Sequence, residues 1–440
     1  MAGDIDILEE LRWRGLLHQC TDEQGLIEHL NTGVRRAYCG YDPTADSLTI
    51  GNLVTIMMLR HWQRAGHKPV VVMGGGTGLI GDPSFKDEER QLRTPEEIER
   101  HIEAQQPIFH ALLDFETEAT RPSIVNNAHW LASISYIDAL RDIGKHFSVN
   151  MMMQKESIRA RLERPDQGIS YTEFSYMILQ AFDFLELNKW CGVTTQLGGS
   201  DQFGNIVAGI DLIRKTRAAS YDIDEEEARA ETFGLTCPLV TKADGTKFGK
   251  TESGAIWLTA DRTSPYAYYQ FWLNTPDADV GRFLRIFTLL PREEIEALET
   301  EHAQNPAART AQRALAREAT TLLHGAEPMN QAEAAGRALF SGDLSGLDER
   351  TLADRFAEIP STAHQRSALE GEGADPVELL VETGLAKSKR EAREFIASGS
   401  VSVSGRKLAE GDRVTPADLL HGSMIAIRRG KKSWHLTRWG

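Results

Sequence analysis

Residues 38–53 read YCGYDPTADSLTIGNL, and this stretch decides the fold of the chain around it. A β-favouring run over residues 34–41 meets an Asp-Pro pair, a polar loop follows, and residues 52–65 have a helical apolar pattern. A strand, a loop and a helix in this order are typical of the first unit of an α/β domain. Unpaired N–H groups and the positive end of the helix dipole meet at such a junction, so an anion could bind there. Gly51 has no Cβ, which would let a flat ligand such as a purine lie against the backbone.

The composition indicates a protein of two or three domains. The chain has 440 residues, of which 41% are hydrophobic and 26% are charged, enough for a large core. Its apolar runs are too short to span a membrane, and the acidic start MAGDIDILEE differs from a basic signal or transit peptide. Cys20, Cys39, Cys191 and Cys237 lie far apart, so neither a disulfide framework nor a protein-held metal is predicted. We therefore expect a cytoplasmic protein with no membrane association.

The charge is unevenly distributed along the chain. The formal net charge of −15 argues against indiscriminate binding of nucleic acid, which needs a concentrated positive surface. Residues 375–440, however, carry 12 Lys and Arg against 8 Asp and Glu. This contrast predicts an acidic enzyme body with a basic appendage.

A glycine-rich loop follows the second predicted strand, PVVVM at residues 69–73. Gly76, Gly78 and Gly81 have the spacing of a dinucleotide fingerprint, which would indicate an NAD-dependent oxidoreductase. Asp-Pro-Ser interrupts the loop where the helix should begin, and no second strand ends in an acid about 20 residues later. NAD therefore remains a distant alternative.

Three loops follow strands of the predicted sheet: TADSLTIGN at residues 44–52, GLIGDPSFKDEER at 78–90 and KADGTKFGKT at 242–251. In open α/β sheets such loops converge at one edge, so we expect them to share a site.

The lysines of these loops are candidates for binding a polyphosphate. Lys247, Lys250 and Thr251 could grip it with two point charges and a hydroxyl, and Lys86 and Arg90 could assist. Taken alone, the lysine loop favours a solvated surface turn over a phosphate site, and Lys86 and Arg90 carry the same ambiguity.

A helix predicted over residues 172–185 carries Tyr176, Gln180 and Asp183 at steps of four and three. These polar groups share one face of an otherwise apolar helix. Taken alone, the three could form a solvated helix face, but their apolar neighbours argue against it, because polar groups in such a setting need partners.

TADSLTIGN and TKFGKT resemble the HIGH and KMSKS signatures of class I aminoacyl-tRNA synthetases. The strings GLIGDPS, GKHFSVN, TEFSYMILQAFDF, GGSDQFGNI and TSPYAYYQFW are similar to bacterial tyrosyl-tRNA synthetases in particular. The match runs from about Tyr38 to the C-terminal end. The resemblance implies a doubly wound (Rossmann-like) parallel-sheet catalytic domain over residues 1–261 with an inserted helical segment at about 130–190, a helical anticodon-binding domain over 262–360, a linker over 361–374, and a small α+β alpha-L RNA-binding domain over 375–440.

The resemblance also implies roles for single residues. Tyr38 and Asp183 would contact the phenolic hydroxyl of bound tyrosine, and a buried carboxylate there would be left unpaired by phenylalanine. The other residues assigned to tyrosine are Asp82, Tyr176 and Gln180 at the ammonium group, with Asn127 and Gln202 at the amino-acid end. Those assigned to ATP are Cys39, Thr55, Gly199 and Asp201 at the ribose, Leu239 and Val240 at the adenine, and Gly40, Asp42, Gly51 and Lys250 around the nucleotide.

The implied chemistry is attack of the tyrosine carboxylate on the α-phosphate of ATP, followed by transfer of tyrosine to the terminal ribose of tRNA-Tyr. Positioning and stabilisation of the charge on the leaving pyrophosphate are sufficient for it, with Mg²⁺ alongside the nucleotide. The residues assigned to this task are Thr44, Thr49, Asn52, Lys86, Arg90, Lys247, Lys250 and Thr251.

Thr49 and Asn52 stand where the HIGH signature has two histidines. Asn52 keeps a side-chain N–H donor and could replace an imidazole nitrogen in a contact to ATP. Thr49 is shorter, so we expect it to contribute little to activation. A second departure is the acidic segment around residues 218–232, whose role the sequence does not indicate.

Residues 375–440 resemble the alpha-L RNA-binding fold of a small-subunit ribosomal protein. The contrast in charge with the rest of the chain favours RNA binding over a merely solvated face. The family resemblance further implies a homodimer. The residues expected to face RNA are Lys387, Lys389, Arg390, Arg393, Arg406 and Lys407.

Two other functions remain open at this point. A tryptophanyl-tRNA synthetase is opposed by Tyr38 and Asp183, which suit a phenol, and by the C-terminal domain. A non-catalytic RNA-binding protein on a synthetase scaffold is supported by the altered HIGH signature and opposed by the retained lysine loop.

Overall fold

The structure, a computed structural model, divides into two compact units. One comprises Met1–Arg262 and Thr275–Glu318, and the other comprises Thr263–Asn274 and Ala319–Gly440. The domain limits given above remain a prediction, since these units are defined by compactness and their boundary falls within a helix. The residues described are 5–81, 93–155, 158–159, 169–228, 231–246, 248–251, 254–341, 344, 347, 349–356, 359–430 and 433–440.

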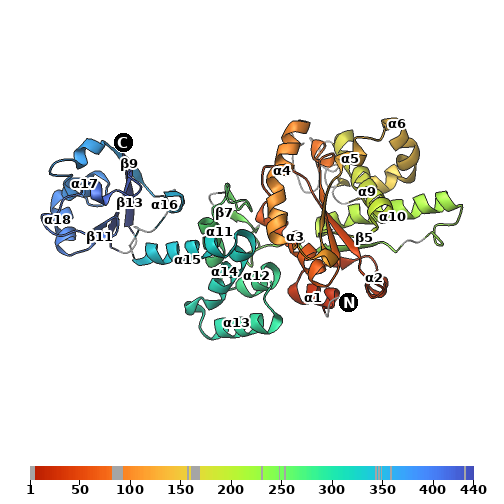
Figure 1. Ribbon diagram of the computed structural model, residues 1–440, viewed down its shortest axis with the longest axis horizontal. Helices are drawn as coiled ribbons and strands as arrows, with labels where there is room; N and C mark the ends of the chain where they lie inside the picture. Colours follow the sequence, from red (N-terminus) through yellow and green to blue (C-terminus); the bar gives the residue numbers. More distant parts are fainter. Residues whose placement is uncertain are drawn as a thin grey trace. The chain divides into compact units, whose positions relative to one another are not determined.

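The first unit is built on a six-stranded sheet with the order β1-β6-β5-β2-β3-β4 (Figure 1). β1 pairs antiparallel with β6, and the other neighbours are parallel, which confirms the predicted parallel α/β sheet. The chain builds one half of the sheet outward from β2 and then returns to build the other half from β5. The strands are β1 Gln19–Cys20, β2 Arg36–Tyr41, β3 Lys68–Met73, β4 Ser123–Asn126, β5 Val193–Gly199 and β6 Phe233–Cys237.

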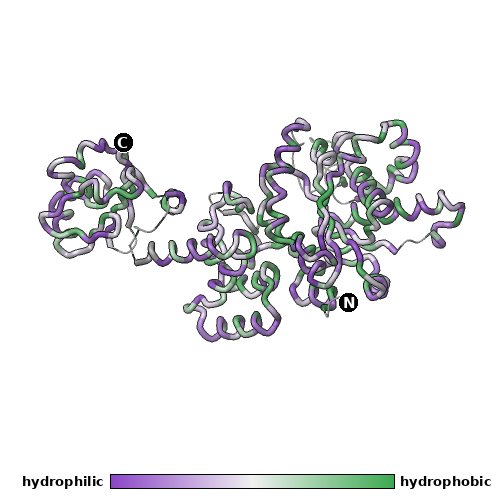
Figure 2. Tube along the Cα trace, viewed as in Figure 1, coloured by the Kyte–Doolittle hydropathy of each residue, from purple (hydrophilic) through white to green (hydrophobic). Residues whose placement is uncertain are grey.

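Apolar strands and capped helices explain this arrangement. The β3 run Pro69 to Met73 is buried throughout, as expected of a parallel strand covered on both faces. The strands run through the middle of the unit as a largely hydrophobic tube in Figure 2. The helices are α1 Ile7–Arg14, α2 Glu23–Leu30, α3 Ile50–Arg64, α4 Pro95–Leu112, α5 Ala128–Leu131, α6 Tyr136–Asp138, α7 Val149–Met153, α9 Tyr171–Cys191, α10 Phe203–Tyr221, α12 Val280–Phe287, α13 Arg292–Gln304 and α14 Thr310–His324, whose last residues belong to the second unit.

β6 ends at Cys237 because Pro238 has no N–H to continue the ladder. α6 is followed by a single π-helical turn, Ala139–Ile143.

Arg14, the last residue of α1, joins this helix to the end of α12. Its Nη1 donates to the carbonyl oxygens of Arg285 and Thr288 at 2.8 and 2.9 Å, and its Nη2 donates to that of Leu290 at 2.7 Å. Its Nε donates to Glu10 at 2.6 Å. Arg14 is 1% exposed, so these are the contacts that compensate the burial of its charge.

The second unit ends in a five-stranded sheet with the order β11-β10-β12-β13-β9. α17 and α18 pack on it over a core that includes Leu380, Ile396, Val403 and Ile427. The helices of this unit are α11 Pro265–Leu273, α15 Ala326–Ser341, α16 Glu349–Phe356, α17 Pro376–Glu382 and α18 Lys389–Ala397, and its strands are β9 Ser361–His364, β10 Val401–Val403, β11 Arg406–Lys407, β12 Met424–Arg429 and β13 Ser433–Trp439.

Residues 361–374 differ from the linker that the sequence predicts. β9 pairs in parallel with β13, and the following turn places Leu369 in the core of the second unit. The strand was missed because it is a short edge strand with no buried residue, so its sequence STAH lacks an apolar alternation. Within the described part of the chain, no helix is long and apolar enough to cross a membrane.

Candidate active site

A cavity of about 460 Å³ opens at the carboxyl ends of β2 and β5. The direction of chain winding reverses between these two strands, and open α/β sheets bind ligands at this point. Most of the residues assigned to a site from the sequence line this cavity: Tyr38, Cys39, Gly40, Asp42, Thr44, Thr49, Gly51, Asn52, Thr55, Asn127, Tyr176, Gln180, Asp183, Gly199, Asp201, Gln202, Leu239 and Val240.

Six further assigned residues belong to the glycine loop and the lysine loop. Lys250 and Thr251 form β7, which pairs with β8 (Gly254–Ala255) in a small hairpin. Four others, Asp82, Lys86, Arg90 and Lys247, lie outside the described residues.

The Asp183 carboxylate, carried by α9, is buried at one end of the cavity. Its two oxygens accept hydrogen bonds from Asn127 Nδ2 at 2.9 Å and Trp130 Nε1 at 2.7 Å. Burial raises its pKa to about 7, against the lowering effect of these two bonds. Each oxygen retains a lone pair, so the carboxylate could accept a further hydrogen bond from a ligand.

The Tyr38 hydroxyl lies near Asp183 and has no hydrogen-bond partner among the described residues. Tyr38 is 1% exposed, and burial, with the Asp183 charge, raises the pKa of its phenol well above the usual value. A buried hydroxyl without a partner is rare, because it costs the desolvation energy of the group. The cavity therefore has a closed end with an unpaired O–H group beside a carboxylate, an arrangement that suits a ligand hydroxyl.

A second cluster of polar groups is centred on Asp42. Tyr176 Oη donates to Asp42 Oδ2 at 2.8 Å, and Thr77 Oγ1 donates to Asp42 Oδ1 at 2.7 Å. Thr77 also accepts from Asn127 Nδ2 at 3.0 Å, which connects this cluster to Asp183. Asn127 therefore supports two acidic groups of the cavity wall besides facing the cavity itself.

Side-chain amides form another part of the wall. Gln180 Nε2 donates to Gln202 Oε1 at 3.2 Å, and Gln202 Nε2 donates to Asp201 Oδ2 at 2.9 Å. Asn205 Nδ2 donates to Gln180 Oε1 at 3.0 Å. This chain of amides links α9 to the start of α10 and fixes the direction in which each amide points.

Two buried thiols, Cys39 and Cys237, line the cavity at the ends of β2 and β6. Burial raises the pKa of Cys39 to about 11 and that of Cys237 to about 12. Both are therefore protonated at neutral pH and serve as small apolar wall groups rather than nucleophiles.

Thr49 and Asn52 form the N-terminal cap of α3. Asn52 Oδ1 accepts from the backbone N and from Oγ1 of Thr49, both at 3.0 Å. Because the amide oxygen is used in the cap, the amide nitrogen is the group left for a ligand. The asparagine thus acts as a fixed N–H donor at the entrance of the helix.

The two signature segments of the sequence lie side by side. Ile50 N donates to Ile256 O at 2.9 Å, and Ile256 N donates to Gly249 O at 3.1 Å. Gly249 has φ +80°, and a Cβ there would lie 2.4 Å from Ile50 Cγ2, so glycine is required for this approach. The described part of the glycine loop contributes Gly74 and Thr77 to the same cavity.

Phe248 anchors the lysine loop on α12. Its ring lies 4.9 Å from that of Phe283 and 5.1 Å from that of Phe287, and it also lines the cavity. Helix α12 is in turn the helix that Arg14 caps.

Several functional residues were missed by the sequence analysis. Thr77 stands inside the glycine loop, and its polar type between glycines was the available signal. The sequence does not indicate the roles of Trp130 and Phe248, because neither an indole N–H donor nor an apolar ring that packs on a helix belongs to a recognisable sequence motif. Among the described residues, no group of three or more His, Cys, Asp or Glu is placed to hold a metal ion.

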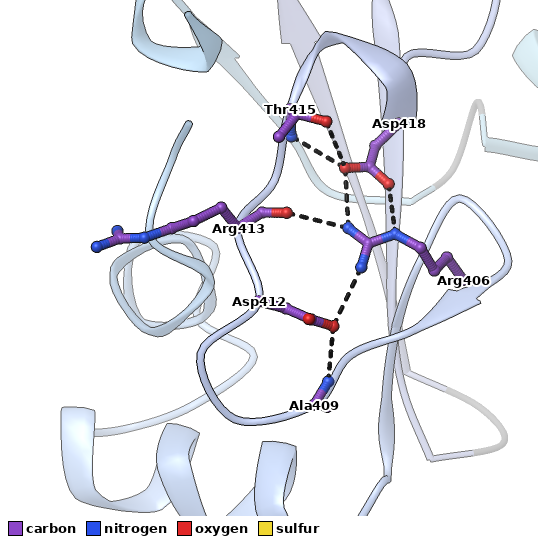
Figure 3. Close-up of polar contacts among 6 residues, drawn as sticks. All are labelled: Arg406, Ala409, Asp412, Arg413, Thr415 and Asp418. Carbon is purple, nitrogen blue, oxygen red and sulfur yellow. Dashed lines mark hydrogen bonds and ion pairs between the residues drawn. The ribbon is translucent and has the colours of Figure 1, made fainter. Parts of the chain in front are cut away.

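The basic residues assigned to RNA are all exposed on the second unit. Helix α18 contains Lys389, Arg390 and Arg393, and Lys387 lies just before it. Strand β11 consists of Arg406 and Lys407. Arg406 differs from the others because four hydrogen bonds to its own unit occupy its guanidinium (Figure 3).

Comparisons with known proteins identify the family of the chain. The family described as "tRNA synthetases class I (W and Y)" matches residues 30–341, and that described as "Tyrosine--tRNA ligase SYY-like C-terminal domain" matches residues 351–437. The tyrosine--tRNA ligase of Geobacillus kaustophilus is 52% identical over 436 residues, which cover 99% of this chain and 100% of that protein. The tyrosine--tRNA ligase of Aliivibrio fischeri is 50% identical over 441 residues, the whole of both chains.

A solved structure of a tyrosyl-tRNA synthetase is also similar to this chain. The C-terminally truncated mitochondrial tyrosyl-tRNA synthetase of Aspergillus nidulans superposes with a TM-score of 0.68 at 30% identity, covering 77% of this chain and 95% of that one. The chain therefore belongs to the class I tRNA synthetases of the W and Y family, and within it to the bacterial-type tyrosyl-tRNA synthetases.

Proposed function

We propose that this chain is a tyrosine--tRNA ligase. It activates L-tyrosine with ATP to tyrosyl-adenylate and pyrophosphate, and then transfers tyrosine to the 3′-terminal adenosine of tRNA-Tyr. The observation that carries the proposal is the closed end of the cavity, where the buried Asp183 carboxylate lies near the unpartnered Tyr38 hydroxyl. The tyrosine--tRNA ligases that match over the whole chain support it.

Tyrosine would enter with its phenol toward Asp183 and Tyr38. The phenol O–H would donate to the carboxylate, and its oxygen would accept from the Tyr38 hydroxyl, which satisfies both groups. The ammonium group would lie beside Tyr176 and Gln180, which line the cavity, and Asp82, as the family resemblance implies.

ATP, as its magnesium complex, would be the second substrate. Its sugar would lie between Cys39 and Asp201, with the adenine toward Leu239 and Val240. Asn52 and the lysines of the two loops would stabilise the charge that develops on the pyrophosphate as it leaves. The remaining contribution is positioning, since the fixed walls hold the tyrosine carboxylate against the α-phosphate.

The second unit would bind the tRNA. The match of residues 351–437 to the C-terminal domain of tyrosine--tRNA ligases and the exposed basic residues of α18 support this role. The helical segment within residues 262–360 would carry the anticodon contacts. Because its substrates occur in the cytoplasm, we propose the same location for the chain.

Amino-acid-dependent ATP–pyrophosphate exchange tests this function directly. Purified protein is assayed with tyrosine, phenylalanine and tryptophan in parallel. Exchange with tyrosine alone is the expected result. Exchange with tryptophan would contradict the substrate, and no exchange from a folded protein would contradict the reaction.

The donor role of Asn52 can be measured in the same assay. Replacing Asn52 with alanine removes the N–H group at the entrance of α3, and we expect the exchange rate at saturating tyrosine to fall about tenfold, the value of one hydrogen bond to a charged group. The Michaelis constant for tyrosine should change little, because Asn52 is not among the groups that bind the amino acid.

Thr49→Ala is the matched variant in the same cap. The Thr49 backbone N still holds the Asn52 amide oxygen without the hydroxyl, so exchange should stay within about threefold of the original. A large loss in Thr49→Ala, or none in Asn52→Ala, would contradict these roles.

We propose further that the chain forms a homodimer through an apolar face of the first unit. Ile137 in α6 is 69% exposed, and Tyr136 Oη lies 3.4 Å from Tyr171 Oη, so both tyrosines belong to one surface. Exposed apolar side chains in consecutive short helices are typical of an interface with a second copy of the chain. The exposed apolar residues of this part of the chain are Tyr136, Ile137, Leu140, Val149, Met151, Met153 and Tyr171.

Ile137→Asp should convert the dimer to a monomer. A charge buried in the interface costs several kcal/mol, enough to dissociate a dimer at micromolar concentration. Light scattering after size exclusion measures the mass, and Val34→Asp, at another exposed apolar residue, is the control. A monomeric original chain, or a dimeric Ile137→Asp variant, would contradict this interface.

A further inference from the structure

The Arg406 guanidinium is held inside a polar network of the second unit (Figure 3). Its Nε and Nη2 donate to the two oxygens of Asp418 at 2.8 and 3.0 Å, and its Nη1 donates to Asp412 Oδ2 at 3.1 Å. Nη2 also donates to the Arg413 carbonyl oxygen at 3.0 Å. A guanidinium has five N–H donors, so only one of them remains for another acceptor.

The two carboxylates also hold the backbone of the loop that follows β11. Asp412 Oδ2 accepts from Ala409 N at 2.9 Å, and Asp418 Oδ2 accepts from Thr415 N at 2.9 Å. The Asp418 side chain is only 7% exposed, so its charge depends on these donors. Arg406 therefore joins both ends of the loop over residues 409–418, and two acidic groups outweigh its positive charge.

The network fixes the backbone at Arg413 and leaves the Arg413 side chain directed away from it. Its carbonyl oxygen is bound by Arg406, and the next residue, Val414, forms an antiparallel bridge with Ala374. In Figure 3 the Arg413 side chain extends away from the five other labelled residues. Its side chain is 44% exposed, and its Nη1 lies 3.8 Å from Asp375 Oδ2, too far for a hydrogen bond.

The Arg413 guanidinium lies on the same side of the unit as the basic end of α18. Asp375 caps α17, and Glu378, three residues later on the same helix face, binds Lys389. Arg413 and Lys389 thus stand beside neighbouring acids of one helix end. A polyanion that contacts Lys389 and Arg390 could reach Arg413 as well.

We infer that Arg406 is a positioning residue, which fixes the 409–418 loop so that Arg413 contacts the RNA backbone. This inference rests on the proposed binding of tRNA by the second unit. It reassigns Arg406, which the sequence predicts as an RNA contact, and adds Arg413, which the sequence analysis did not include.

Substitution with lysine distinguishes the two possible roles of Arg406, a direct contact to RNA and the positioning of the 409–418 loop. Lysine keeps the charge and binds phosphate well, but a single ammonium cannot bridge Asp418, Asp412 and the Arg413 carbonyl. We expect Arg406→Lys to weaken tRNA-Tyr binding about as much as Arg406→Gln, by roughly tenfold. Arg438→Lys, at an exposed arginine of the same unit that is not assigned to RNA, is the matched control and should bind within about twofold of the original.

Asp412 distinguishes a positioning role of Arg406 from an effect of charge alone, because the two predict opposite changes in the affinity for tRNA-Tyr. Removing a negative charge beside an RNA surface should strengthen binding if only charge matters. We expect Asp412→Ala to weaken binding instead, because it releases Arg406 and Ala409 N, whereas Asp412→Asn keeps an acceptor oxygen and should bind at least as tightly as the original.

The measurement is a filter-binding titration with tRNA-Tyr over a range of salt concentrations. ATP–pyrophosphate exchange on the same preparations gives the amount of active protein, and circular dichroism checks the fold. Arg413→Gln should reduce the slope of log affinity against log salt by about one, and Arg413→Lys should restore it.

The outcomes distinguish this inference from the proposed function. Normal binding by Arg406→Lys, or tighter binding by Asp412→Ala, would overturn the inference and leave tRNA binding intact. An unchanged salt slope in Arg413→Gln would overturn the contact. If the original chain fails to bind tRNA-Tyr, the proposed function and the inference both fail.

Discussion

Asp183→Asn is expected to lower kcat/KM for tyrosine by about 100-fold without lowering that for phenylalanine. A hydrogen bond to a buried charged group contributes about 1.5–3 kcal/mol, which corresponds to a factor of roughly 10–150. Asparagine also turns an NH₂ group toward Asn127 Nδ2 or Trp130 Nε1, both of which are donors. Phenylalanine makes no bond to this group, so its reaction should not suffer. Tyrosyl-tRNA synthetases are an established example of such selectivity for a substrate hydroxyl.

The ratio of kcat/KM for tyrosine and phenylalanine in pyrophosphate exchange measures this effect. Asp46→Asn is the control, because Asp46 is an exposed carboxylate that pairs with Arg262 outside the cavity lining. A ratio in Asp183→Asn equal to that of the original chain would show that Asp183 does not read the hydroxyl.

Arg14→Met is expected to destabilise the first unit by about 3–5 kcal/mol. The variant leaves the carbonyl oxygens of Arg285, Thr288 and Leu290 without the donor that satisfies them, and it leaves Glu10 without its partner. Breaking a buried charged network in this way carries a cost of that size. Because α12 supports Phe248 in the lysine loop, the exchange rate should become heat-sensitive as well.

Urea unfolding followed by tryptophan fluorescence measures the change in free energy. Arg12→Met, two residues earlier, is the matched control, because Arg12 is 49% exposed and pairs only with surface acids. Its free energy of unfolding should change by no more than about 0.5 kcal/mol. If Arg14→Met were as stable as Arg12→Met, water would be the donor that replaces the guanidinium.

The parallel sheet and the polar face of α9 could be predicted because each leaves a periodic pattern in the sequence. The buried run at residues 69–73 has the composition of a covered parallel strand, and Tyr176, Gln180 and Asp183 recur at helical spacing. These residues do come together at one cavity. The sequence could not predict which side chain supports which.

Support roles depend on contacts between residues far apart in the chain. Thr77 connects Asp42 to Asn127, and Trp130 holds Asp183, yet neither stands in a pattern that a linear sequence displays. Arg406 was assigned to RNA for the same reason. Its residue type suits an RNA contact, but its side chain is bound to Asp418 of its own unit. Edge strand β9 was missed because a polar strand of four residues has no alternation to detect.

The raised pKa of Asp183 makes the charge at this end of the cavity sensitive to pH near neutrality. Among the described residues that line the cavity there is no histidine, and the carboxyl group of Asp183 is the one whose pKa is raised to about 7. Above that pH the group is charged and penalises phenylalanine; as the pH falls through 7, it becomes protonated and the penalty shrinks. The selectivity of pyrophosphate exchange for tyrosine over phenylalanine should therefore decrease as the pH of the assay is lowered through about 7.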